Sequence, residues 1–369
     1  MIDSNLKKVV IITAMPSPYR DDFFKELINH YPQYSFYILY ITSEKGIRDW
    51  KIEQNKLKNA RILKSKKIVI KKDLDDWNII ISYGVCRELR KIRPDVIIGA
   101  EYNLAIQQAL LYAKWFNVPF ISWTDGSPVS EMNINKIQYL LRKRVYRNAS
   151  SFIASSSRSK ELQLQYGADE NRIYTSFITV NLNKFRFEKN DYSNDLLYVG
   201  SLIKRKGVDL LLNALVFIHQ DYTLHIVGSG REEEELRDLA ASLGIGSKVI
   251  FHGFVQQEEL KELYSKAGIF ILPTREDCFG LVTLEAMCAS LPIVTSKYAD
   301  GAFDLVEDGY NGYVVDPNDA RGFGLKIETL LSNKEKCREF GRKSLLMTSR
   351  FEFSEVMKPF IQAIESVLI

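Results

Sequence analysis

The chain of 369 residues has few of the side chains that build metal centres or disulfide frameworks. It contains four cysteines and four histidines. The cysteines form no Cys-x-x-Cys pair, and the histidines show no spacing typical of metal ligands. The sequence therefore predicts no metal site built by the protein, and it favours a reducing, cytoplasmic environment.

Long hydrophobic runs are also missing. A transmembrane helix needs about 18 consecutive apolar residues, and no run approaches that length. The apolar run VVIITAM follows Lys7 and Lys8, but it ends at Pro16 and no small-x-small cleavage site follows. We therefore interpret it as a buried strand and not as a signal peptide. Any contact of this chain with a membrane is expected to be peripheral.

Net charge is low at +4, but the charges are unevenly distributed. Residues 1–185 contain 29 Lys and Arg against 18 Asp and Glu, whereas residues 186–369 contain 21 against 28. Basic stretches lie at 64–72 (KSKKIVIKK) and 141–147 (LRKRVYR). Each stretch is either a solvated helix face or loop, or a surface that attracts anionic lipid headgroups or a phosphorylated acceptor. No nucleic-acid-binding motif accompanies them, so nucleic acid is not expected as a partner.

Short apolar runs alternate with helical patterns along the whole chain, which predicts an α/β protein. The polar segment 186–195 interrupts the alternation and predicts a boundary between two doubly wound domains, 1–186 and 187–352. In the first half we expect strands at 8–13, 34–41, 95–100, 118–123 and 151–155, and helices at 20–30 and 103–116. In the second half we expect strands at 196–200 and 222–228, and helices at 207–220 and 231–244.

One carboxylate lies alone in an apolar segment of the second half. Between Cys278 and Ser296 the only charged residue is Glu285. The pattern predicts a strand that ends at Pro273, a loop, and a helix that begins at Gly280. The first turn of such a helix has free N–H groups suited to a diphosphate, and Glu285 lies one and a half turns further in. Burying a carboxylate without partners is unfavourable, so it needs hydrogen-bond donors such as ribose hydroxyls. In the alternative, Glu285 is an exposed helix residue and Asp277, in the loop, is only an N-cap.

The segment D-x-F-G-L-V-x-L-E-A-M, followed by SLPIVTS and EDGYNGYVVDPND, resembles the retaining glycosyltransferases of family 4, also called group 1. The resemblance covers about residues 195–332. It implies the GT-B fold, in which two Rossmann-like domains face each other across a cleft. It also implies that the last helix, 353–369, crosses back to the N-terminal domain.

The resemblance assigns the donor site to the second domain. The family has two glutamates separated by seven residues; Glu285 matches the second, which holds the ribose, and Asp277 replaces the first, which contacts the donor sugar. In GSLIKRKGVDLLLNAL, Lys206 matches the family lysine that neutralises the diphosphate. Ser201 stands where the family has arginine, and either Arg205 or Lys204 is the substitute for that arginine. The alternative role of the KRK triplet, residues 204–206, is that of solvated loop charge. Phe254 and Val255 are candidates for contact with the nucleotide base, and core packing is their alternative role. The implied catalytic residues are Asp277, Glu285 and Lys206, and the implied donor-binding residues are Gly200, Ser201, Arg205, Lys206, Phe254, Val255, Phe279, Gly280, Leu281, Val282 and Glu285.

The first half resembles the acceptor domain of the family more loosely. Tyr19 and Arg20 are candidates for contact with an acceptor phosphate or sugar, although Arg20 could simply begin a helix. The family often has a histidine near the reaction centre, but SWTDGSP (122–128) has none. Asp125 is the nearest polar candidate there, and an Asp-Gly turn is the alternative role.

Taken together, the sequence predicts a retaining transferase that moves a sugar from a UDP- or GDP-sugar to an acceptor hydroxyl without a metal or other cofactor. The acceptor is expected to be a lipid-linked glycan for cell-surface polysaccharide, at the inner face of a membrane with anionic lipids, although a small soluble acceptor is an alternative. Two other functions fit the same pattern. One is a nucleotide-sugar-binding module without activity, and the other is a nucleotide-sugar epimerase.

Overall fold

The computed structural model describes residues 6–43, 57–70, 77–132, 134–187, 189 and 191–368. The described residues form two compact units. Unit 1 extends to Val180 and also includes the end of the chain from Phe353, and unit 2 comprises Asn181–Glu352. Glu188 and Asn190 of the expected boundary segment, and Lys71 and Lys72 of the first basic stretch, lie outside the described residues.

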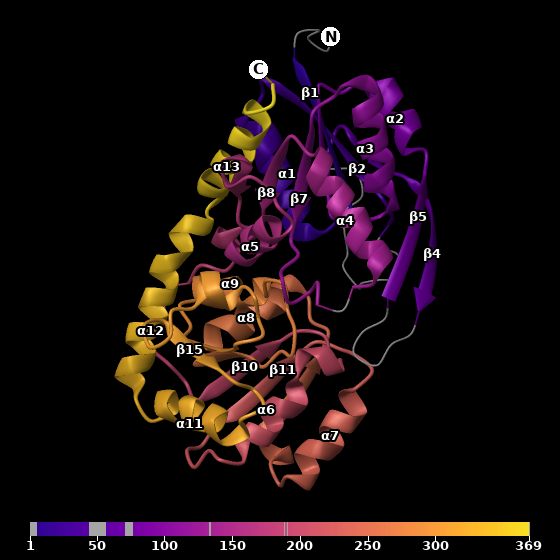
Figure 1. The fold of residues 1–369 in the computed structure, drawn as a ribbon. Coiled ribbons are helices and arrows are strands. Elements are labelled where there is room, and N and C mark those ends of the chain that lie inside the picture. The colour runs from indigo at the N-terminus through magenta and orange to yellow at the C-terminus, as the bar shows by residue number, and fades with distance from the viewer. Residues whose placement is uncertain are drawn as a thin grey trace. The chain divides into compact units, whose positions relative to one another are not determined.

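Unit 1 is a parallel sheet with helices on both faces (Figure 1). Its strand order is β3-β2-β1-β6-β7-β8-β9, so the order reverses between β1 and β6, as in a doubly wound fold. Its strands are β1 Lys7–Thr13, β2 Tyr34–Tyr40, β3 Ala60–Ile62, β4 Lys64–Ile70, β5 Trp77–Tyr83, β6 Val96–Ala100, β7 Phe120–Thr124, β8 Ser151–Ala154 and β9 Ile173–Thr175. Its helices are α1 Pro18–His30, α2 Val85–Ile92, α3 Leu104–Phe116, α4 Lys136–Asn148, α5 Ser157–Gln165, the 3-10 turn η1 Glu170–Arg172, and α13 Phe353–Glu365.

Alternate residues of the central strands point into two separate cores of unit 1. Val10 and Ile12 pack against α2, α3 and α4 on one face of the sheet. Val9 and Ile11 pack against α1 and α13 on the other face. Burial on both faces explains why these strands appear in the sequence as continuous apolar runs. The last helix therefore belongs to the core of unit 1, although the preceding 172 residues, Asn181–Glu352, form unit 2.

A solvated helix face or loop was one of the two interpretations of the first basic stretch, and its described part forms neither a helix nor a loop. Residues 64–70 form β4, which pairs antiparallel with β5. Lys64, Lys66, Lys67 and Ile68 are exposed, and Ser65 is partly buried. Extended backbone satisfies its hydrogen bonds through the partner strand, and local charge does not reveal that partner.

Unit 2 repeats the architecture with a six-stranded parallel sheet. The order β12-β11-β10-β13-β14-β15 reverses between β10 and β13. Its strands are β10 Asp195–Val199, β11 Thr223–Val227, β12 Val249–Gly253, β13 Ile269–Leu272, β14 Ile293–Ser296 and β15 Gly312–Val315. Its helices are α6 Val208–Leu215, α7 Glu233–Ser242, α8 Gln257–Lys266, α9 Leu281–Cys288, α10 Ala302–Leu305, α11 Ala320–Leu331 and α12 Lys334–Met347, with 3-10 turns η2 Leu182–Lys184, η3 Lys204–Lys206, η4 Gly246–Lys248 and η5 Thr348–Phe351.

Two glycines bring the loops of unit 2 close together at the carboxyl ends of β10 and β13. Gly207 precedes α6 with φ +70°, and a Cβ atom there would lie 2.3 Å from the carbonyl oxygen of Pro273. Gly280 precedes α9 with φ +74°. Only glycine combines this backbone conformation with so little space. Helix α6 ends at Leu215, so the expected helix over 207–220 is too long at its C-terminal end.

Candidate functional site

In unit 1, Arg20 lies buried at the carboxyl ends of the central strands. Its side chain forms an ion pair with Asp125, the residue after β7. The guanidinium carbon also lies 4.2 Å from the centre of the Trp123 ring, at cation–π distance. Ser155, after β8, donates a hydrogen bond of 2.6 Å to Asp125 Oδ1 and accepts one of 2.8 Å from Trp123 Nε1. These contacts hold Arg20 and Asp125 in fixed positions.

Glu101 completes this cluster from the end of β6. Its Oε1 accepts a hydrogen bond of 3.1 Å from the backbone N–H of Asp125. Glu101 has φ 71°, a backbone conformation that non-glycine residues adopt rarely and that clusters at functional sites. Burial, reinforced by repulsion from Asp125, raises the pKa of Glu101 to about 7. Two carboxylates and one buried guanidinium therefore meet at this edge of the sheet.

A small pocket of about 20 Å³ opens beside Arg20, with room for about one water molecule. Arg20 Nη1 is buried and has no hydrogen-bond partner among the described residues. The pocket can therefore offer a charged donor to a small polar group. Its walls come from Tyr19, Arg20, Phe23, Trp123 and Ser176–Thr179.

In unit 2, polar side chains join the two loops that follow β10 and β13. Arg275 donates two hydrogen bonds, of 2.7 and 2.8 Å, to the carboxylate of Asp209 on α6. Lys204 also pairs with Asp209, at 3.1 Å. The hydroxyl of the buried Thr274 lies 3.0 Å from the carbonyl of Arg205 and 2.8 Å from that of Glu276. A bidentate arginine fixes geometry as well as charge, so both loops are held in one arrangement.

Lys206 and Asp277 form an ion pair between these two loops. Their side chains are 16% and 14% exposed, so most of their surface is removed from water. Asp277 Oδ1 also accepts a hydrogen bond of 3.3 Å from the backbone N–H of Phe279. Burial by itself would raise the pKa of Asp277, but the charge and hydrogen bond of Lys206, together with the charge of Arg205 and the N–H of Phe279, outweigh it and the pKa is lowered. Asp277 is therefore ionised at neutral pH.

Glu285 lies on α9 and receives a hydrogen bond of 2.9 Å from the hydroxyl of Tyr264 on α8. Tyr264 is fully buried and Glu285 is partly buried. Among the described residues, no cation forms a salt bridge with Glu285. Burial raises the pKa of Glu285 to about 7, although the hydrogen bond from Tyr264 acts in the opposite direction. The carboxylate thus retains capacity to accept further hydrogen bonds from a ligand.

The sequence pattern of the family described as "Glycosyl transferases group 1" matches residues 180–346, nearly all of unit 2. This match covers 167 of the 369 residues. An uncharacterized glycosyltransferase of Methanocaldococcus jannaschii is 29% identical over 216 residues, 54% of each chain. Such alignments span about half the length of the curated relatives.

Two solved structures are similar to this chain over almost its whole length. Anabaena HepE in complex with UDP has a TM-score of 0.78 at 17% identity, covering 97% of this chain and 100% of the other. The lipopolysaccharide outer core galactosyltransferase WaaB has a TM-score of 0.74 at 20% identity, covering 97% and 99%. The expected GT-B fold is therefore confirmed.

The structure brings several of the predicted donor residues together at one end of the unit 2 sheet. Lys206 and Asp277 meet directly, Gly200 and Ser201 follow β10, and Leu281 and Val282 form the first turn of α9. Arg205 donates a hydrogen bond of 2.9 Å to the carbonyl of Glu276 in the opposite loop.

Three hydrophobic candidates of the donor site differ in exposure. Phe254 is 43% exposed beyond the end of β12. The side chains of Val255 and Phe279 are buried, at 9% and 5%, and the Phe279 ring packs against Phe351. Donor contact by Phe279 stays a prediction, and its backbone N–H donates to Asp277 Oδ1. For Val255, the core-packing alternative fits the observed burial.

The sequence analysis missed Tyr264, Arg275 and Glu101. Tyr264 is an apolar position of α8 by its spacing, and nothing local links it to Glu285. Arg275 and Asp209 are 66 positions apart, so only the fold reveals their pairing. The described residues contain no group of three or more His, Cys, Asp or Glu that could hold a metal ion. They also contain no helix with the length and hydropathy of a membrane span.

Proposed function

We propose that this chain transfers a sugar from a nucleotide-diphosphate sugar to an acceptor hydroxyl. The observation that carries the proposal is the Lys206–Asp277 ion pair at the reversal of the unit 2 sheet, next to the N-terminal turn of α9. Ligands of open α/β sheets bind at this reversal, outside the carboxyl ends of the strands. The family match of residues 180–346 and the UDP in the similar HepE structure support a nucleotide sugar as donor.

In this proposal, the loops of unit 2 stabilise the departing nucleotide diphosphate. The N–H groups of Gly280, Leu281 and Val282 and the ammonium of Lys206 offer positive charge where negative charge develops as the sugar–oxygen bond breaks. Donors that are fixed before the reaction need no reorganisation during it, which lowers the barrier. Glu285 accepts hydrogen bonds from ribose hydroxyls, and Asp277 faces the donor sugar. No metal is required if these groups suffice.

A donor screen tests this function. The purified protein is mixed with UDP- and GDP-sugars, and the thermal midpoint and the release of free nucleotide are recorded. We expect one donor to raise the midpoint and to be hydrolysed slowly without acceptor. Binding without turnover across many acceptors would instead identify a binding module. The replacement of the family arginine by Ser201 and of the family glutamate by Asp277 favours this alternative. Conversion of the donor sugar without acceptor would identify an epimerase.

We further propose that the anomeric configuration is retained, as in the family 4 enzymes that the sequence resembles. The segment 122–128 contains no histidine, so the leaving phosphate itself is the proposed acceptor of the proton from the attacking hydroxyl. The anomeric proton coupling of the first product, measured by NMR before mutarotation, tests this proposal. A product of inverted configuration would overturn it.

For the acceptor we propose a lipid-linked glycan used in cell-surface polysaccharide synthesis, at the cytoplasmic face of a membrane. The excess of cations in residues 1–185 favours an acceptor with phosphate groups. The name of the similar WaaB structure, a lipopolysaccharide outer core galactosyltransferase, also supports a glycan acceptor. A small soluble acceptor would compete poorly with such a glycan in a transfer assay.

Tyr19, Arg20 and Asp125 are proposed to bind this acceptor. We expect Asp125→Asn to lower kcat/KM for the acceptor about 10- to 100-fold, because a hydrogen bond to a charged group contributes about 1.5–3 kcal/mol. Donor affinity should be unchanged. Saturation kinetics with each substrate varied separately measure both effects.

Asp125→Asn is preferred to removal of Arg20, because the asparagine keeps a carbonyl oxygen for the buried guanidinium. Asp238→Asn, on α7 of unit 2, is the matched control for the loss of one carboxylate. An increase in the donor KM with an unchanged acceptor KM would contradict the assignment. The circular dichroism spectrum of each variant separates this result from a loss of folded protein.

A further inference from the structure

Helix α3 presents apolar residues on the side that faces away from the sheet. Leu104, Leu111 and Trp115 are 41%, 49% and 85% exposed. Their spacing of seven and four residues places them along one face of the helix. The opposite face is buried in the core of unit 1, for example at Ile106 and Ala109. Tryptophan with its ring almost fully in water is unfavourable, so this face needs a partner.

Helix α4 continues the exposed surface. It packs on the same face of the sheet as α3, and Gln107 on α3 donates a hydrogen bond of 3.1 Å to a carbonyl of α4. Its exposed residues follow one stripe of the helix with a spacing of three or four residues. The stripe begins with Ile137 and Leu140, which are 70% and 62% exposed, and it continues with the exposed Arg144 and Arg147.

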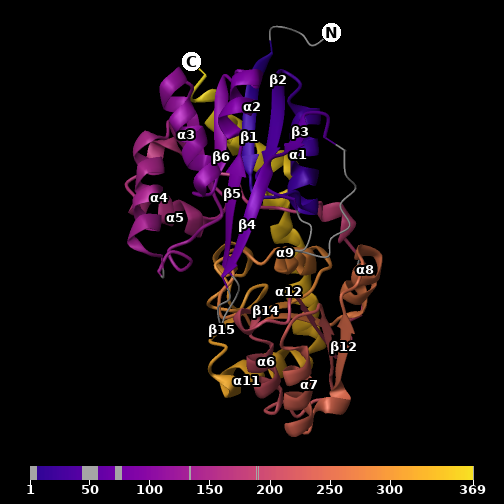
Figure 2. The same cartoon turned by 90° about the vertical axis from the view of Figure 1, so that its right-hand side faces the viewer.

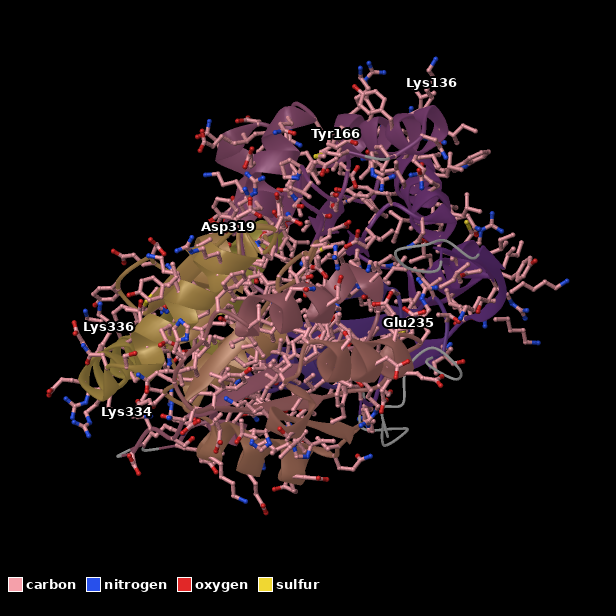
Figure 3. The ribbon with its side chains drawn as sticks, turned by 90° about the horizontal axis from the view of Figure 1, so that it is seen from below. Lys136, Tyr166, Glu235, Asp319, Lys334 and Lys336 are labelled. Atoms are coloured by element: carbon pink, nitrogen blue, oxygen red, sulfur yellow. The ribbon has the colours of Figure 1, made fainter. Side chains whose placement is uncertain are left out.

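Cations predominate on this surface, and one of them, Arg142, is paired with Glu131. The sequences of β4, α3 and α4 contain no Asp or Glu, but they contain Lys or Arg at 64, 66, 67, 114, 136, 142, 143, 144 and 147. Hairpin β4–β5 lies beside α3, where Gln108 donates a hydrogen bond of 3.3 Å to the carbonyl of Ser82 (Figures 1 and 2). The two basic stretches, 77 residues apart in the sequence, thus flank the apolar face of α3. Lys136 begins α4 and points away from its ribbon (Figure 3).

We propose that Leu111, Trp115, Ile137, Leu140, Arg144 and Arg147 form a docking surface for an anionic lipid bilayer. An amphipathic surface with exposed Trp and Leu next to uncompensated cations matches both the apolar and the anionic parts of a lipid headgroup region. Another protein with an acidic surface would match the positive charge. It would not explain why the Trp115 ring projects into solvent, where no side chain of the described residues forms a pocket around it. The purpose of this surface, which is to bring the enzyme to a lipid-linked acceptor, rests on the proposed function. The binding of the surface to lipid does not.

Vesicle binding tests the surface without donor or acceptor, so its outcome is independent of transferase activity. The full chain is sedimented with phosphatidylcholine vesicles, with or without about one-third phosphatidylglycerol. We expect binding only to the anionic vesicles, weakened by salt. In a background with Trp50 and Trp77 replaced by phenylalanine, brominated lipids should quench the protein fluorescence. Trp115→Phe should remove most of that quenching, since Trp123 is only 5% exposed.

Two variants separate the apolar and the electrostatic contributions. Leu111→Ser with Trp115→Ser should weaken binding by about tenfold or more, and Arg144→Ser with Arg147→Ser by about 30-fold at low salt. The matched controls lie in unit 2: Leu346→Ser, at a site that is 70% exposed, and Arg321→Ser with Lys326→Ser, both exposed on α11. These should bind as the unaltered protein does.

Equal binding to neutral and anionic vesicles, or equal loss in the control variants, would overturn the proposal. So would a change from dimer to monomer in light scattering on replacement of Leu111 and Trp115, because a second copy of the chain would then cover this face. Loss of vesicle binding with intact turnover of a soluble acceptor analogue would support the docking surface. If the unaltered protein binds anionic vesicles but turns over no donor, the result would count against the proposed function and not against this surface.

Discussion

Replacement of Glu285 by glutamine is expected to lower donor affinity about 100-fold and to leave the protein at least as stable as before above pH 7. Each hydrogen bond from a ribose hydroxyl to a carboxylate contributes about 1.5–3 kcal/mol. Two such bonds correspond to about a 100- to 10,000-fold loss of affinity when the carboxylate is removed outright. Glu285→Ala should reach the upper part of that range and Glu285→Gln the lower part. Isothermal titration with the donor from the screen measures both values.

The stability of the variant follows from the raised pKa of Glu285. The folded carboxyl has a pKa of about 7 against an ordinary value of 4.5. Between these values the folded state binds more protons than the unfolded state, so stability falls as pH rises from 4.5 to 7. Above pH 7 the ionised carboxylate is therefore a net cost to folding. Because Glu285 is partly exposed, we expect Glu285→Gln to gain only about 1–2 kcal/mol there.

The same pKa predicts how donor affinity depends on pH. Ligand hydroxyls donate hydrogen bonds to the ionised carboxylate, so binding to the protonated form requires loss of a proton first. Affinity should fall by up to about tenfold per pH unit below pH 7. The dependence should disappear in Glu285→Gln.

The control for Glu285 is Glu235→Gln on the exposed side of α7, labelled in Figure 3. It removes the same charge from unit 2 and should change neither donor affinity nor its pH dependence. Donor binding by Glu285→Gln at the affinity of the unaltered protein would contradict the ribose assignment. A fall in its thermal midpoint at pH 8 would contradict the account of its stability.

Lys206→Met is expected to lower both stability and turnover. Removing one partner of a mostly buried ion pair leaves Asp277 as an unpaired charge, which costs about 3–5 kcal/mol. Loss of one positive group from the diphosphate site should reduce kcat about 100- to 1,000-fold, as for other fixed donors at a developing charge. Chemical denaturation and single-turnover kinetics measure the two effects separately.

The double variant Lys206→Met with Asp277→Asn separates structure from function. Asparagine has no charge to leave unpaired, so most of the lost stability should return. Turnover should remain low, because neither the cation nor the carboxylate is restored. Recovery of turnover together with stability would mean that the pair only holds the loops in place.

The lowered pKa of Asp277 also predicts how the stability of the protein changes at acid pH. Its pKa is lowered in the folded state from 3.8, so the ion pair stabilises the fold above that pH and is lost as pH falls through the lower folded value. Asp277→Asn should therefore flatten the stability curve at the acid end. As a control, Asp316→Asn, whose exposed pair with Lys297 is solvent-screened, should have a smaller effect.

Most of the fold could be predicted from the pattern of apolar residues. Buried strands such as β1 and β13 are short apolar runs, and helices such as α9 begin at a glycine that adopts the left-handed conformation. These features are local, because each depends on neighbouring residues and on backbone sterics. The hairpin β4–β5 was not predicted, since its lysines follow no apolar alternation and its pairing depends on contact with another strand.

The sequence by itself determined that two βα domains form and that Glu285 follows a strand, a loop and the N-terminal turn of a helix. Periodicity, glycine conformation and family motifs suffice for this, because they act over a few neighbouring residues. Only the tertiary structure decided that Lys206 meets Asp277, 71 positions away, and that Tyr264 donates to Glu285. It also decided that two distant basic stretches flank Trp115. Such pairings depend on the order of strands in the sheet, which brings together side chains that no local pattern relates.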